Sequence, residues 1–154
     1  MRVFNLNDRE LDESRDRPGW RVRGASVGEK IEAELIGGTV YEVEPGNRLW
    51  PYHTHHANEE WAIVVGGRPT LRTPEGEQQL TQGDAVCFPR GKDGAHQIRN
   101  DTEEPIRVLM LSTLLKPDIV EYLDSGKVGA RSIAGERILM SRPGPELDYW
   151  DGED

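Results

Sequence analysis

The stretch GNRLWPYHTHHANEEWAIVVGG, residues 46–67, carries most of the information about fold and chemistry in this chain. Three of the chain's four histidines stand in it, at positions 53, 55 and 56. Residues two apart in an extended strand point to the same side, so His53 and His55 can direct two imidazoles at one point while Thr54 faces away. We therefore expect a strand here with one face able to bind an ion, and we expect His56 to point outward.

Two residues outside this pair can complete a metal site. Glu60 precedes the apolar run Trp61–Val65, where the next strand begins, and lies opposite the histidine pair if the two strands pair. Glu59 competes for this role, but the position of Gly67 seven residues after Glu60 favours Glu60. Imidazoles with one carboxylate suit transition metals better than Ca²⁺ or Mg²⁺. The sequence predicts one divalent transition metal ion (Fe, Mn, Ni or Zn), with the ligands His53, His55, Glu60 and His96.

The rest of the chain alternates short strand patterns with turns. Thr39–Glu44 alternates polar and apolar side chains at period two and stops at Pro45-Gly46. Residues 70–80 form a hairpin pattern around Pro74-Glu75-Gly76, and Ile106–Ser112 is a further strand. Many short strands joined by turns predict an all-β sandwich or barrel.

Length and charge exclude several classes of protein. The 154 residues fit one domain, and 28 acidic against 19 basic residues give a formal net charge of −9. Such a chain repels phosphate backbones and anionic lipids, so we expect neither nucleic acid nor a membrane as partner. No signal peptide is recognisable and Cys87 is the single cysteine, which favours a cytoplasmic location.

Two spaced motifs resemble those of the cupin superfamily. The first is Gly46-x6-His53-x-His55-x4-Glu60-x6-Gly67, and the second is Gly83-x5-Pro89-x-Gly91-x4-His96-x3-Asn100. The gap before His53 is one residue longer, and the gap before His96 two residues longer, than the family pattern. All four metal ligands of that pattern are nevertheless present. The remaining segments are similar to those of a group of small bacterial cupins with no established substrate.

The resemblance implies a double-stranded β-helix, or jelly-roll, cupin barrel that holds the metal inside and often dimerises. We expect the barrel over residues 29–114, an N-terminal arm over residues 1–28 that packs on the barrel or on a partner subunit, and an irregular C-terminal extension over residues 115–154. Residues 117–123 are open to a helical turn or an extended edge, and residues 138–141 to a late strand. Homodimerisation is expected from the resemblance and from the arm.

A small-molecule ligand is the expected partner. The predicted pocket residues fall into two groups. Trp50, Tyr52 and Trp61 are aromatic residues near the histidines, and Tyr41 and Arg72 could reach an anionic group. Core packing explains the aromatic residues equally well, and arginines are mostly surface residues.

The resemblance leaves two classes of function open. One is an enzyme that uses the metal as Lewis acid or oxygen activator on a small, oxygen-rich metabolite, in an isomerase-like or dioxygenase-like reaction. The alternative is a non-catalytic module that binds or senses a small molecule. A metal that serves stability alone ranks last, because closed structural sites favour thiolate ligands.

Overall fold

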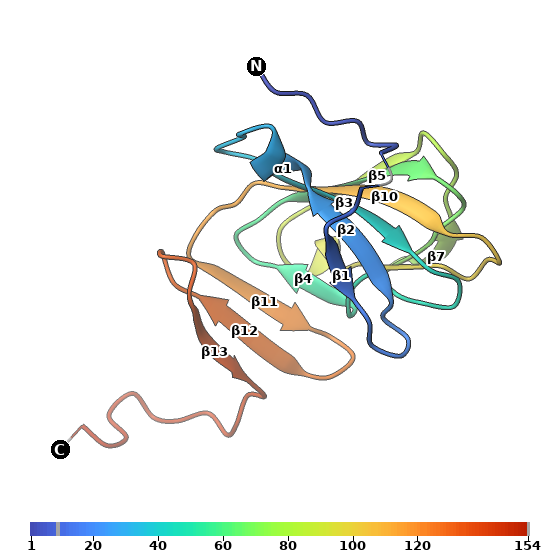
Figure 1. Ribbon diagram of the computed structural model, residues 1–154. Coiled ribbons are helices and arrows are strands. Elements are labelled where there is room, and N and C mark those ends of the chain that lie inside the picture. The colour runs from blue at the N-terminus through green and yellow to red at the C-terminus, as the bar shows by residue number, and fades with distance from the viewer. Residues whose placement is uncertain (9, 154) are drawn as a thin grey trace.

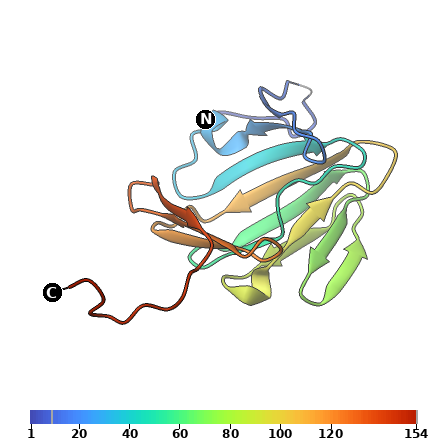
Figure 2. The ribbon, with the colours of Figure 1, turned by 90° about the horizontal axis from the view of Figure 1, so that it is seen from below.

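The computed structural model describes residues 1–8 and 10–153 and shows a molecule built of antiparallel strands (Figures 1 and 2). In the described part, the helical segments are the four-residue α1 (Val27–Lys30) and the 3₁₀ turn η1 (Lys92–Gly94). None of the described helices is long and apolar enough to cross a membrane. The architecture confirms the predicted all-β class.

The strands form three sheets. The six-stranded sheet has the order β1 (Glu13–Arg15), β2 (Val22–Ser26), β3 (Gly37–Val43), β10 (Ile106–Ser112), β5 (Glu60–Gly66), β8 (Ala85–Phe88). The four-stranded sheet has the order β13 (Arg137–Ser141), β12 (Lys127–Arg131), β11 (Asp118–Tyr122), β4 (His53–His55). The three-stranded sheet has the order β7 (Gly76–Gln79), β6 (Thr70–Thr73), β9 (Gln97–Arg99).

The six-stranded sheet is covered on both faces, which explains its apolar strands. Along β10, Ile106 and Val108 enter the main core, while Leu109 belongs to a second cluster on the opposite face. The sequence of a strand that is buried on both faces is a continuous apolar run, without alternation of polar and apolar residues. The main core joins this sheet to the three-stranded sheet through Val22, Val43, Leu49, Ala62, Val64, Leu71, Leu80, Phe88, Ile98, Ile106, Val108 and Met110.

The N-terminal residues lie on the outer face of the six-stranded sheet. Phe4, Leu6 and Leu11 pack against the second cluster, which contains Val40 and Leu109. Strands β1 and β2 then extend the sheet, and β2 pairs with β3 from Val22↔Val43 to Ser26↔Thr39. The segment expected as an arm is therefore built into the sheet of its own chain.

The C-terminal segment is more regular than the irregular extension expected. Strand β11 pairs with the free edge of β4, with His55 opposite Val120, and β12 and β13 follow as a meander. Residues 118–122 are thus extended, and the late strand is present. All five residues of β13 are exposed, so its sequence lacks the alternation that marks a half-buried strand. Beyond Ser141 the chain runs away from the sheets, and residues 142–153 form no further strand (Figures 1 and 2).

Candidate metal centre

Strands β4 and β5 and the segment before β9 bring the four expected ligands together. Donor atoms of His53, Glu60 and His96 all lie within 4.8 Å of one another. Glu60 Oε2 lies 3.4 Å from His96 Nε2 and 3.6 Å from His55 Nε2. His55 contacts this group through Glu60, so three side chains form the close donor group and His55 lies beside it.

Backbone pairing holds His96 opposite His53. The His53 amide donates to the His96 carbonyl at 3.2 Å, and the His96 amide donates to the His53 carbonyl at 2.9 Å. The two rings lie 4.7 Å apart, centroid to centroid. The ring of Phe88 stacks on His96 at 3.7 Å and closes the apolar side. The longer loop before His96 therefore does not displace this histidine from the site.

All three imidazoles have an oxygen acceptor at Nδ1. His53 Nδ1 lies 2.7 Å from the Pro51 carbonyl, and His96 Nδ1 lies 2.9 Å from the Gly94 carbonyl. His55 Nδ1 lies 2.6 Å from Asp118 Oδ2. A ring whose Nδ1–H donates to oxygen keeps its lone pair on Nε2, which is the tautomer required of a metal ligand.

Burial keeps two of these rings neutral. Desolvation, together with the charge of neighbouring His55, lowers the pKa of His53 from 6.5 to about 4. Desolvation and the charge of His53 lower the pKa of His96 to about 3. A neutral imidazole is the form that binds metals, so the site is ready for a cation at neutral pH.

The residues fit a transition metal. Glu60 is largely buried, and desolvation raises the pKa of its carboxyl group. His96 Nε2 is fully buried and makes no hydrogen bond with a described residue, although buried polar atoms almost always have a partner. A divalent cation held by these residues would satisfy this nitrogen and compensate the buried carboxylate. Imidazole with one carboxylate is a donor set for Fe, Mn, Ni or Zn.

Asp118, at the start of β11, is the residue of the site that the sequence did not reveal. Its side chain is 5% exposed and accepts hydrogen bonds from His55 and, at 3.0 Å, from the Ala57 amide. Burial raises its pKa, but these hydrogen bonds outweigh burial and leave the pKa below 3.8. Asp118 is therefore an anion that orients His55. No motif marks it, and its one sequence signal is its place at the start of a strand.

Side chains alternate in direction along β5 and β4, and this alternation separates the candidate ligands from their neighbours in the sequence. Glu59 is exposed and accepts a hydrogen bond from Trp61 Nε1 at 3.0 Å, away from the histidines. His56 points outward, as expected, with Nε2 2.6 Å from Glu121 Oε1. The prediction that Trp61 lines the pocket is wrong. Glu60 faces inward, so Trp61, the next residue in the strand, faces outward and is 44% exposed.

A cavity of about 620 Å³ opens onto His53, His55 and Glu60, and we name it the metal cavity. Tyr41 and Trp50, two of the residues expected at a substrate pocket, line this cavity, and their rings meet edge to face at 5.7 Å. Sequence analysis missed the wall contributed by the C-terminal strands. That wall includes Tyr122, Lys127, Arg131, Arg137 and Met140.

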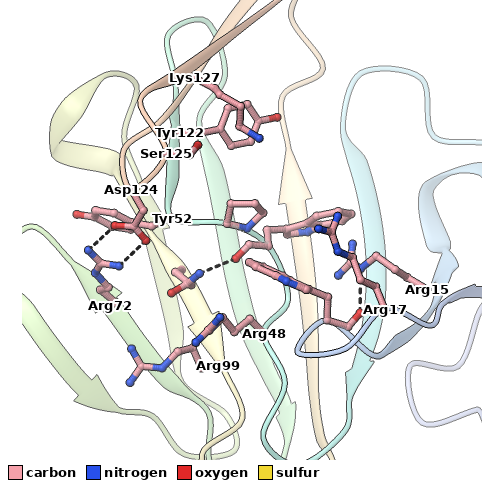
Figure 3. A pocket seen from close by; sticks show the side chains of 14 residues that line it. Arg15, Arg17, Arg48, Tyr52, Arg72, Arg99, Tyr122, Asp124, Ser125 and Lys127 are labelled. Atoms are coloured by element: carbon pink, nitrogen blue, oxygen red, sulfur yellow. Dashed lines mark hydrogen bonds and ion pairs between the residues drawn. The ribbon is translucent and has the colours of Figure 1, made fainter. Parts of the chain in front are cut away.

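A second cavity of about 620 Å³ holds Tyr52 and Arg72, the other two predicted pocket residues (Figure 3). The Arg72 guanidinium lies over the Tyr52 ring at 3.9 Å. Because arginines dominate its lining, we name it the basic pocket. Trp50, Pro51, Tyr122 and Lys127 line both cavities, so the two lie next to each other.

Known proteins share this architecture. The family model described as "Cupin domain" matches residues 39–112. A crystal structure from Acidithiobacillus ferrooxidans, of a protein provisionally named a sugar phosphate isomerase, is 31% identical, with 84% of each chain covered and a TM-score of 0.74. A cupin-superfamily sugar phosphate isomerase from Silicibacter pomeroyi is 24% identical, with 80% of this chain and 81% of that chain covered and a TM-score of 0.72.

The fold is also similar to that of the polyketide cyclase RemF from Streptomyces resistomycificus. That protein is 18% identical, with 98% of this chain and 91% of that chain covered and a TM-score of 0.60. Among curated proteins, none matches the sequence significantly. The matching family model, the relative at 31% identity and the shared fold show that this chain belongs to the cupin superfamily, as its two motifs predicted.

Proposed function

We propose that the protein is a metal-dependent isomerase of a small, oxygen-rich carbonyl compound such as a sugar. The observation that carries the proposal is the close group of donor atoms from His53, Glu60 and His96, with His55 in contact with Glu60, beside the metal cavity. A cavity of about 620 Å³ is large enough for a ligand of this size. A divalent metal bound by these residues supplies a Lewis acid that polarises a carbonyl group.

Similarity supports the reaction class. The relative at 31% identity carries a provisional name as a sugar phosphate isomerase, and it matches this chain over 84% of its length. Isomerisation of a hydroxy-carbonyl compound needs a metal or another electrophile beside the carbonyl and a side chain that moves a proton. The residues of the metal cavity are the candidates for holding the metal and for moving the proton.

The proton-transfer group must lie outside the ligand set, because a ligand's lone pair is engaged. Tyr41, Tyr122 and Lys127 line the metal cavity and carry groups able to hold a proton. Burial raises the pKa of the Tyr41 hydroxyl, which keeps it protonated at neutral pH. Tyr41 is thus suited to donate a hydrogen bond to a substrate oxygen, and Tyr122 is the first residue to substitute in a search for the base.

The first experiment is elemental analysis of protein purified without added metal, with wild type and His55→Ala in parallel. We expect about one equivalent of Fe, Mn, Ni or Zn per chain in the wild type, on the ligand count of a single cupin site, and less in the variant. Absence of metal after reconstitution of the wild type contradicts the proposal.

The second experiment tests the reaction. Metal-loaded protein is incubated in D₂O with pentose and hexose phosphates, and deuterium at the carbon next to the carbonyl is followed by NMR. Exchange that is lost on chelation supports an isomerase. Oxygen consumption by an iron-loaded protein points to the dioxygenase-like alternative, and binding of a ligand without turnover points to the sensing module.

A further inference from the structure

The basic pocket is strongly cationic for so acidic a chain. Its lining has six basic residues and one acidic residue, Asp124, whereas the whole chain has a formal net charge of −9. Figure 3 shows these side chains arranged around the pocket. They come from the N-terminal segment, from the barrel and from the β11–β12 turn, so folding gathers them: Arg15, Arg17, Arg48, Arg72, Arg99 and Lys127.

Two of the six cations already have anionic partners. Arg72 makes two hydrogen bonds with Asp124, both 2.9 Å long. Arg99 pairs with Glu77 at 2.6 and 2.9 Å, and Asp101 also contacts it. These two residues are part of the structural ion-pair network and are not free to bind a ligand at low cost.

The other four cations have no such partner. Among the described residues, no ion pair joins a carboxylate to Arg15, Arg17, Arg48 or Lys127. Arg15 is partly buried, and desolvation lowers the pKa of its guanidinium. Like charges gathered in one pocket repel one another, and water screens this repulsion at Arg17 and Arg48, which are exposed. An anion bound among them relieves this repulsion.

Aromatic rings lie against two of these guanidinium groups. Arg15 lies 4.2 Å from the centroid of the Trp50 ring, and Arg48 lies 5.6 Å from that of Trp20. Arg15 also donates to the backbone carbonyls of Trp20 and Leu49. Stacking leaves the N–H groups of Arg48 free at the rim of its plane, the geometry in which guanidinium binds phosphate oxygens two at a time.

The basic pocket lies close enough to the metal ligands to hold another part of the same molecule. Tyr122 and Lys127 line both cavities, and the Lys127 ammonium is 5.2 Å from the Tyr122 ring centroid. The Tyr122 ring also stacks on the His53 imidazole at 6.1 Å. One aromatic ring therefore contacts both a cation that has no ion-pair partner among the described residues and a candidate metal ligand.

We propose that the basic pocket binds the phosphate group of a phosphate monoester of a small hydroxylated compound, through Arg17, Arg48 and Lys127 with Arg15 behind them. The position of the remainder of that compound in the metal cavity rests on the proposed function. Phosphate binding itself does not require the metal. The two ideas can thus fail separately.

The test is calorimetric titration of metal-stripped protein with inorganic phosphate, fructose 6-phosphate and fructose. Both phosphate compounds are expected to bind, more weakly as salt is raised, and fructose is not. Arg48→Gln and Arg17→Gln are each expected to weaken binding about tenfold or more, the usual size of a charge-assisted hydrogen bond. Arg68→Gln is the matched control, since Arg68 is exposed outside both cavities, and its binding should equal that of wild type.

Circular dichroism melting establishes that each variant is folded. If Arg48→Gln does not fold, Arg17→Gln decides, because the Arg17 side chain is exposed. Phosphate binding that neither arginine variant weakens, or no binding to folded wild type, overturns the proposal. Isomerase activity is measured separately on metal-loaded protein: binding that depends on Arg48 and Arg17 supports the pocket even if no isomerase activity is found.

Discussion

Substitution of Asp118 tests how a residue outside the candidate ligand set affects metal affinity through His55, which belongs to that set. It accepts the Nδ1 proton of His55 at 2.6 Å, and its side chain is nearly isosteric with asparagine. Asp118→Asn removes the charge that orients and polarises the ring. Loss of such a partner costs about 10- to 100-fold in metal affinity. We expect that loss in a competition titration with a chromophoric chelator.

Glu121→Gln is the matched control for Asp118→Asn. Glu121 also contacts a histidine, His56, at 2.6 Å, but that histidine lies outside the site. Its substitution should leave metal affinity unchanged. Equal affinities for wild type and Asp118→Asn would show that His55 is oriented by the strand alone.

The metal-stripped protein is expected to lose stability in mild acid because of two buried histidines. The pKa of His53 falls from 6.5 to about 4 on folding, and that of His96 falls to about 3. Between these values and 6.5 the unfolded chain binds more protons than the folded chain, so the stability present above pH 6.5 is lost as the pH falls toward 4. Each group adds a slope of up to about 1.4 kcal/mol per pH unit.

Urea unfolding from pH 7 to pH 4.5 measures this slope. His96→Gln, whose side chain cannot take up a proton in this range, should show a shallower dependence than wild type. Parallel pH profiles for the two proteins would mean that His96 is not neutral in the folded chain.

The four candidate ligand residues could be singled out from the sequence because their spacing is local. His53 and His55 share one face of a strand, Glu60 begins the next strand, and a second motif includes His96. Asp118 was not predictable in this way. It reaches His55 across 63 residues through the β4–β11 pairing, and a carboxylate at the start of a strand has no distinguishing pattern.

The loop around η1 positions His96, and Gly94 is the residue on which its turn depends. A Cβ atom on Gly94 would lie 1.7 Å from the Pro89 carbonyl oxygen, so the backbone must shift to accept a side chain. The Gly94 carbonyl is also the acceptor for His96 Nδ1. Gly94→Ala should destabilise the fold by about 1–3 kcal/mol, the usual cost of overpacking, and should weaken metal binding. Urea unfolding and chelator competition measure the two effects.

Gly66→Ala is the control for this loop substitution. Nothing lies within 4 Å of a Cβ atom on Gly66, so the added methyl group has space. The control should retain the metal affinity of wild type. If Gly94→Ala also retains it, the turn does not position His96.

The strands differed in how clearly they could be predicted, and burial explains the difference. Strands β5 and β10 lie in the middle of a sheet covered on both faces, so their apolar residues marked them in the sequence. Strand β13 is an edge strand with every residue exposed, and its pattern was ambiguous. The loop from Gly91 to His96 is longer than the family pattern, yet η1 folds the extra residues and His96 still pairs with His53.

We predict that two copies of the chain associate through the exposed edge of the four-stranded sheet, which would give the homodimer expected from the sequence. Ile138 is 67% exposed and Leu139 is 47% exposed, on an edge strand with unpaired backbone groups. Edge strands of this kind pair readily unless charged residues prevent it. The double substitution Ile138→Lys and Leu139→Lys should therefore convert the dimer to a monomer in sedimentation velocity. Neither residue lines the metal cavity, so metal content should not change.

The net charge of the chain predicts how this association depends on salt concentration. Two copies with a formal net charge of −9 each repel one another at long range, and salt screens that repulsion. The dimer should therefore tighten as salt is raised, whereas a dimer held by surface ion pairs would weaken. Leu35→Lys, at a residue that is 80% exposed and far from β13 in the sequence, is the control and should sediment like wild type. A wild-type chain that sediments as a monomer at all salt concentrations would contradict the prediction, and a double variant that remains dimeric would move the interface away from β13.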